Sequence, residues 1–166
     1  DPFRPSLRKI FTRKAADMAT NTGPVVSVLE KALADTYALA LKTQNYHWNV
    51  TGADFFQLHG MFEEQYGDLS GAVDELAERI RALGHLSPGG LKAFQSLTQI
   101  EDGDGSSSPI DMVNDLAKDH ETVSNLLKEG VAAAEENGDV STADMLTGRL
   151  TVHQKATWML NATAAR

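Results

Sequence analysis

The chain contains no cysteine, which excludes disulfide scaffolds, thiolate zinc sites and cysteine nucleophiles. No apolar run approaches the roughly 20 residues that a membrane-spanning helix requires. No apolar stretch typical of a signal peptide follows Asp1, so we expect a soluble cytoplasmic protein with no membrane partner. Of the 166 residues, 42% are apolar and 23% are charged, which is ordinary for one globular domain with its own core.

Two common motifs of metal enzymes are also missing. None of the five histidines has a glutamate three residues before it, so a dinuclear centre of the usual bundle type within one chain is not expected. The HExxH motif is absent too, because His120-Glu121 continues as Thr-Val-Ser. No arrangement of serine, histidine and aspartate indicates a hydrolase, and that activity therefore ranks last.

Charge is unevenly distributed along the chain. The net charge is −8, from 15 basic and 23 acidic residues. Residues 1–20 alone carry a net +3, so the remaining 146 residues carry −11. We therefore predict a basic N-terminal arm, residues 1–22, followed by an acidic domain, residues 23–166, and the two parts suit different partners. The basic residues of the arm are Arg4, Arg8, Lys9, Arg13 and Lys14.

Apolar residues recur every three or four positions along four segments, which predicts four long helices. The segments cover residues 25–50, 53–84, 109–137 and 139–164. Asp54 is a candidate N-cap of the second helix, and Ser108 with Pro109 begins the third. Residues 91–97 predict a short helix in a long crossover, and Trp158 is expected to pack in the core. The prediction is an all-α fold, a ferritin-like four-helix bundle with a short helix between helices 2 and 3.

Two histidines and three acidic residues form a candidate metal site. His59 and Glu63 are four residues apart on the second helix and share one face, and Asp74 and Glu78 repeat this spacing. His47 ends the first helix. Imidazole nitrogens with carboxylates suit iron, manganese or zinc better than copper(I). Taken singly, His47 could be a surface histidine at a helix end, and His59 with Glu63 a simple helical pair.

The helical spacing indicates that such a site needs two copies of the chain. From Glu63 to Asp74 is 11 residues, which rotates the helix by only about 20° but advances it by roughly 16 Å. One metal therefore cannot use both pairs of one chain. An antiparallel second copy would bring Asp74 and Glu78 opposite His59 and Glu63, which creates two identical sites between subunits. A dimer is thus the smallest expected functional unit.

The motifs as a set resemble the Dps family, the mini-ferritins first described as DNA-binding proteins from starved cells. The pieces that match are YHWNV, LHGMFEE and DELAERI, in which His59 follows His47 by twelve residues and Asp74 follows after fifteen more. The segment ADMLTGRLTVHQKATWML also resembles the last helix of the family. The similarity covers roughly residues 25–163.

The resemblance implies which residues bind iron and catalyse its oxidation. His47, His59 and Glu63 match the ligands that the family takes from one subunit, whereas Asp74 and Glu78 match those from the two-fold partner. Trp48 matches a tryptophan beside the iron site. Many family members have aspartate at the position of Glu63. The longer carboxylate would either bind or bridge iron directly or shift the second iron.

The function implied by the resemblance is that of an iron-storage and detoxification ferroxidase in oxidative stress. It would oxidise Fe(II), preferably with hydrogen peroxide, and store Fe(III) mineral inside a hollow cage of twelve subunits. The alternative is a DNA-protecting coat protein that compacts the nucleoid and has a secondary or zinc-filled metal site. The family also has an acidic three-fold pore near the start of the last helix, where Asp139 and Asp144 fall here. Acids in a first helical turn are equally consistent with helix capping.

DNA binding stays open at this stage. The five basic residues of the arm could contact phosphates, and a cage would multiply such weak contacts without giving sequence preference. Apolar residues alternate with these basic residues, however, so the arm could equally pack on a neighbouring subunit. The interleaved apolar residues are Phe3, Leu7, Ile10 and Phe11.

Overall fold

The computed structural model describes residues 22–165, and all regular structure within this range is helical. The helices are α2 (Gly23–Asn49), α3 (Phe55–Ala82), α4 (Leu91–Leu97), α5 (Pro109–Glu136) and α6 (Val140–Ala164). Four long helices with a short helix between the second and third confirm the predicted all-α fold. The basic arm lies outside the described residues except for Thr22, as do all five of its basic side chains. The division into an arm and a domain therefore stays a prediction.

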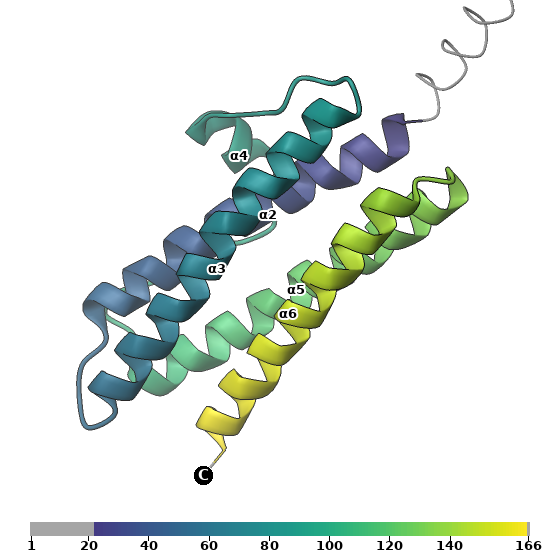
Figure 1. The fold of residues 1–166 in the computed structure, drawn as a ribbon. Coiled ribbons are helices and arrows are strands. Elements are labelled where there is room, and N and C mark those ends of the chain that lie inside the picture. Colours follow the sequence, from purple (N-terminus) through teal and green to yellow (C-terminus); the bar gives the residue numbers. More distant parts are fainter. Residues whose placement is uncertain (1–21, 166) are drawn as a thin grey trace, which may run out of the picture.

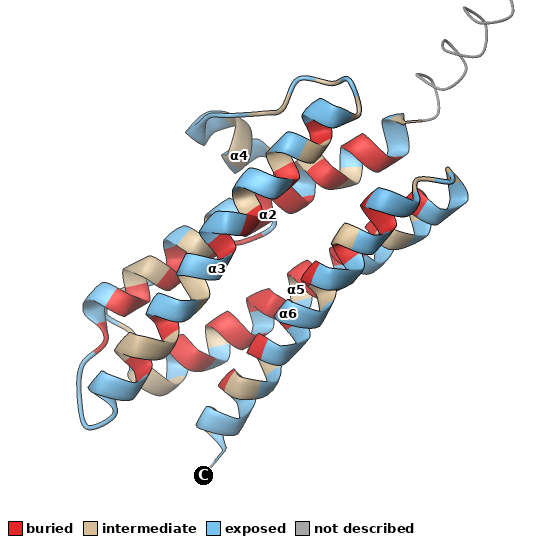
Figure 2. Cartoon of the chain, in the orientation of Figure 1, coloured by how far each residue is buried: buried red, intermediate tan, exposed pale blue. Residues whose placement is uncertain are grey.

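The long helices form two antiparallel pairs (Figure 1). Helix α2 packs along α3, and α5 packs along α6. Contacts between α2 and α5 join the two pairs, and α4 in the crossover lies against α2. Buried residues line the facing sides of the helices, and exposed residues cover the outer sides (Figure 2). None of the described helices is both long enough and apolar enough to span a membrane.

The helix ends follow from local residue chemistry. The Ser108 side chain accepts a hydrogen bond from the backbone N–H of Asp111 and caps α5, with Pro109 in the first turn. Helix α3 ends before Gly84, whose φ of 90° is a left-handed conformation that favours glycine. Asp54 immediately precedes α3 as predicted, but its side chain makes no capping hydrogen bond.

The core contains most of the predicted apolar stripe of α3, but not all of it. Leu58, Phe62 and Leu69 of α3 are at most 3% exposed. Phe55, in contrast, is 41% exposed, and Tyr66 is half-buried. These two rings belong to the stripe by spacing, but they lie at its edge rather than at its buried centre.

Trp158 was expected in the core, and that prediction is wrong, because its side chain is 66% exposed. The buried stripe of α6 includes Arg149, His153, Ala156 and Leu160. Trp158 is two residues from both Ala156 and Leu160, and about 200° of helical rotation places it on the opposite face.

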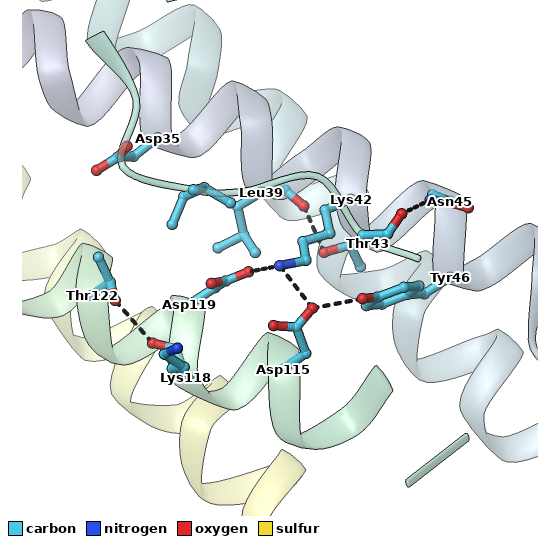
Figure 3. Close-up of polar contacts among 12 residues, drawn as sticks. Asp35, Leu39, Lys42, Thr43, Asn45, Tyr46, Asp115, Lys118, Asp119 and Thr122 are labelled. Atoms are coloured by element: carbon cyan, nitrogen blue, oxygen red, sulfur yellow. Dashed lines mark hydrogen bonds and ion pairs between the residues drawn. The ribbon is translucent and has the colours of Figure 1, made fainter. Parts of the chain in front are cut away.

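A buried polar network anchors α2 to α5 (Figure 3). The Lys42 Nζ atom lies 2.7 Å from a carboxylate oxygen of Asp115 and 2.7 Å from one of Asp119. The Tyr46 hydroxyl donates to Asp115 at 2.6 Å. Burial alone would lower the pKa of Lys42, but the two carboxylates outweigh it and raise that pKa. The lysine therefore stays charged, and the network fixes the last turns of α2 next to His47.

Candidate metal centre

His47 and His59 meet where α2 ends and α3 begins. The Nδ1 atom of His47 lies 2.8 Å from the backbone carbonyl oxygen of His59, and Nδ1 of His59 lies 2.8 Å from the carbonyl oxygen of His47. Their rings are stacked, with centroids 3.8 Å apart and planes 17° from parallel. The five-residue connection between the two helices therefore brings together two residues twelve apart in sequence.

This reciprocal contact determines the tautomer of both rings. A carbonyl oxygen can only accept a hydrogen bond, so Nδ1 of each histidine carries the hydrogen and donates it. In a neutral imidazole the other nitrogen, Nε2, then has a free lone pair. A backbone acceptor on the second nitrogen is the usual support of a metal-binding histidine, since it fixes both ring orientation and tautomer. The pair thus presents two nitrogens suited to a divalent cation.

Two aromatic side chains extend the stack. The Phe55 ring is stacked on His59 with centroids 4.9 Å apart and planes 28° from parallel. The Tyr66 ring meets His47 edge-on, with centroids 5.2 Å apart and an angle of 73° between the planes. Phe55, His59 and Tyr66 all come from α3, and only His47 comes from α2.

The carboxylates predicted to complete the site do not surround the histidines within one chain. Glu63 follows His59 by one helical turn and is exposed. Asp74 and Glu78 lie further along α3, and both are exposed. Among residues 22–165, no group of three or more histidine, aspartate or glutamate side chains is placed to hold a metal ion. Whether these carboxylates complete a site across two copies of the chain stays a prediction.

The other predicted functional residues are placed as follows. Trp48 is next to His47 and 61% exposed, so it is not a core residue of the single chain. Asp139 caps α6 through the backbone N–H of Thr142 and pairs with Arg79 at 2.7 Å. Burial alone would raise the pKa of Asp139, but these hydrogen bonds and the arginine lower it. Asp144 is exposed one turn further along. The pore assignment of both aspartates stays a prediction.

Some of this geometry carries no sequence signal. The carbonyl groups that orient His47 and His59 belong to the backbone, and no residue type reveals them. By spacing, Phe55 and Tyr66 belong to the apolar stripe of α3, which does not reveal their ring contacts with the two histidines. The one hint in the sequence is that the apolar stripe of α3 begins at Phe55, one helical turn before His59.

Comparisons with known proteins identify the family of the chain. A family model described as a ferritin-like domain matches residues 26–166. DNA protection during starvation protein 2 of Bacillus anthracis is 37% identical over 138 residues, which cover 83% of this chain and 94% of that protein. An uncharacterized low temperature-induced protein of Nostoc is 38% identical over 140 residues, covering 83% and 78% of the two chains.

Solved structures of other proteins have the same fold as this chain. A Dps protein from Bacillus brevis superposes with a TM-score of 0.85 at 34% identity, over 88% of this chain and 98% of that chain. Dps from Vibrio cholerae, described as a member of a superfamily of ferritin-like diiron-carboxylate proteins, gives 0.85 at 29% identity, over 89% and 92%. The fold, the family model and the relatives together show that this chain belongs to the Dps family, within the ferritin-like diiron-carboxylate superfamily.

Proposed function

We propose that this protein is a cytoplasmic ferroxidase, which binds Fe(II) as its substrate at sites shared between two antiparallel subunits. The observation that carries the proposal is the locked pair His47 and His59, whose Nε2 atoms are both free to bind a cation. Imidazole and carboxylate ligands together suit iron. Asp74 and Glu78 of the partner subunit would supply the carboxylates that one chain cannot bring to its own histidines.

The residues have distinct roles in this mechanism. His47 and His59 bind Fe(II) through Nε2, because Nδ1 of each ring donates to a backbone carbonyl. The carboxylates of Asp74, Glu78 and Glu63 neutralise the cations and favour the more highly charged Fe(III) product. The Glu63 side chain is exposed and one turn from His59, so it can turn toward a second iron.

The chemistry balances with two irons for each peroxide. Two Fe(II) ions give up two electrons, and hydrogen peroxide takes them with two protons to form two water molecules. Because both electrons arrive at one site, the O–O bond is cleaved without release of a hydroxyl radical. The Fe(III) ions would then move to carboxylates inside a hollow assembly of twelve subunits and mineralise, with Asp139 and Asp144 as candidate residues of the Fe(II) entry pore.

The test is anaerobic addition of Fe(II) followed by hydrogen peroxide, with oxidation followed by absorbance. We expect about two irons oxidised per peroxide, and we expect His47→Ala combined with His59→Ala to lose the fast phase, because two of the ligands are removed. His85→Ala is a matched control, since His85 bonds to Thr22 away from the site. Equal rates in the double variant and the wild type would contradict the ferroxidase assignment.

The names of several relatives favour a second candidate function, a DNA-protecting coat whose metal site is secondary or binds zinc. In this interpretation the basic arm, with Arg4, Arg8, Lys9, Arg13 and Lys14, contacts phosphates. A gel-shift series against salt concentration, with and without residues 1–20, tests it. Binding should weaken steeply as salt rises and disappear with the deletion. Binding that survives the deletion would show that the arm is not the contact.

A further inference from the structure

We infer that Phe55 and Tyr66 are positioning residues of the metal centre, because their rings contact the stacked imidazoles of His59 and His47. This inference rests on the proposed function, since it concerns how the histidines of that site are held. We assign neither residue as a ligand of the metal. Their effect is on the orientation of the two rings.

Phe55 covers the ring of His59. The two residues are four apart on α3 and therefore lie on the same helical face. His59 is stacked on His47 as well as on Phe55, and both planes are within 28° of parallel. Two rings cannot cover the same face at these distances, so His59 lies between Phe55 and His47. An apolar ring therefore covers the face of the His59 imidazole that His47 leaves open.

Tyr66 contacts the other histidine of the pair, His47. Its ring meets His47 edge-on, an arrangement that aromatic quadrupoles favour. Tyr66 follows Glu63 by three residues, so the same turn of α3 carries a proposed ligand and the side chain that contacts His47. His47 is 7% exposed and has little room to rotate while this ring is present.

The contacts matter because an imidazole can flip. A half-turn of either ring would move Nδ1 away from the carbonyl oxygen, and Nε2 would change its direction as well. The two carbonyl hydrogen bonds oppose such a flip, and the flanking rings remove the space for it. Loss of a residue that supports a metal ligand typically weakens metal binding ten- to a hundred-fold.

A neighbouring residue provides a matched control. Phe56 follows Phe55 directly, has the same side chain and is 82% exposed. Among the described residues, Phe56 makes no ring contact with either histidine. A change at Phe56 removes a similar amount of apolar surface and leaves the stack intact.

The experiment titrates the full-length protein in its native assembly with Co(II), which is not oxidised under these conditions. Phe55→Leu and Tyr66→Leu should each raise the Co(II) dissociation constant about ten-fold and alter the visible d–d absorption, because the nitrogens no longer point correctly. Phe55→Tyr and Tyr66→Phe keep the rings and should restore both values. Phe56→Leu should match the wild type.

Leucine variants that match the wild type in both affinity and spectrum would overturn the inference, and so would a ten-fold loss in Phe56→Leu. If Tyr66→Leu fails to assemble, Phe55→Leu decides alone, because its site is 41% exposed and tolerates truncation. Failure of the proposed function gives a different result from failure of this inference. In that case the wild type itself would not bind Co(II), or binding would survive His47→Ala combined with His59→Ala, and the inference would fall with it.

Discussion

At the residue scale, the spacing of five side chains along the sequence predicts which residues form the metal site. His47, His59, Glu63, Asp74 and Glu78 were predicted as ligands from helical periodicity and from resemblance to a family. Their assignment as ligands stays a prediction. The structure adds the reciprocal hydrogen bonds of His47 and His59. These bonds could not be predicted, because they depend on two backbone carbonyls brought close by the turn between helices.

A second histidine pair, away from the site, has a consequence for stability. His120 and His153 are buried, and their Nδ1 atoms lie 2.9 Å apart. Burial, followed by the charge of Arg149, lowers the pKa of His120 to about 4. Burial, His120 and Arg149 lower the pKa of His153 to about 2. Both rings are therefore neutral in the folded protein at every pH above about 4 to 5.

This pair predicts loss of stability in mild acid. The unfolded histidines bind protons near pH 6.5, but the folded ones do not, so the free energy of unfolding falls as pH drops below about 6.5. One such histidine accounts for about 2 kcal/mol between pH 7 and pH 5. Replacing both, His120→Leu with His153→Leu, should flatten this dependence, measured by urea unfolding at several pH values. An unchanged slope would show that other groups cause the acid sensitivity.

At the scale of elements, the helix boundaries were largely predictable because they depend on local chemistry. Gly84 ends α3, and Ser108 as the cap with Pro109 in the first turn begins α5, for reasons contained in a few residues. The face that each helix buries was less predictable. In α6 the polar residues Arg149 and His153 occupy core positions, so the apolar pattern does not reveal that Trp158 points outward.

The network between α2 and α5 predicts a large effect of a single lysine. Lys42 is 4% exposed and pairs with Asp115 and Asp119, so Lys42→Met would leave two carboxylates without their cation. Removing one partner of a buried ion pair typically costs about 3–5 kcal/mol. Urea unfolding should show this loss, whereas Lys31→Met on the exposed face of the same helix should change little. Similar small losses in both variants would contradict the anchoring role.

At the scale of the whole molecule, the proposed function requires two copies of the chain, each of which supplies half of the ligands of a site. The pairs His59–Glu63 and Asp74–Glu78 lie on one stripe of α3 and are separated by roughly 16 Å, so an antiparallel neighbour can exchange them. The number of subunits in the assembly could not be derived from the sequence, because it depends on contacts outside the face of α3 that carries these two pairs.

Complementation between two inactive variants tests the shared site most directly. One variant carries His47→Ala and His59→Ala, and the other carries Asp74→Ala and Glu78→Ala. Each should lack fast Fe(II) oxidation by peroxide when it is purified alone. Co-expressed in equal amounts, they should regain about a quarter of the wild-type rate, because one quarter of the sites in random pairs receive intact histidines and intact carboxylates. Mixed assemblies that remain as inactive as their parents would contradict a site built by two subunits.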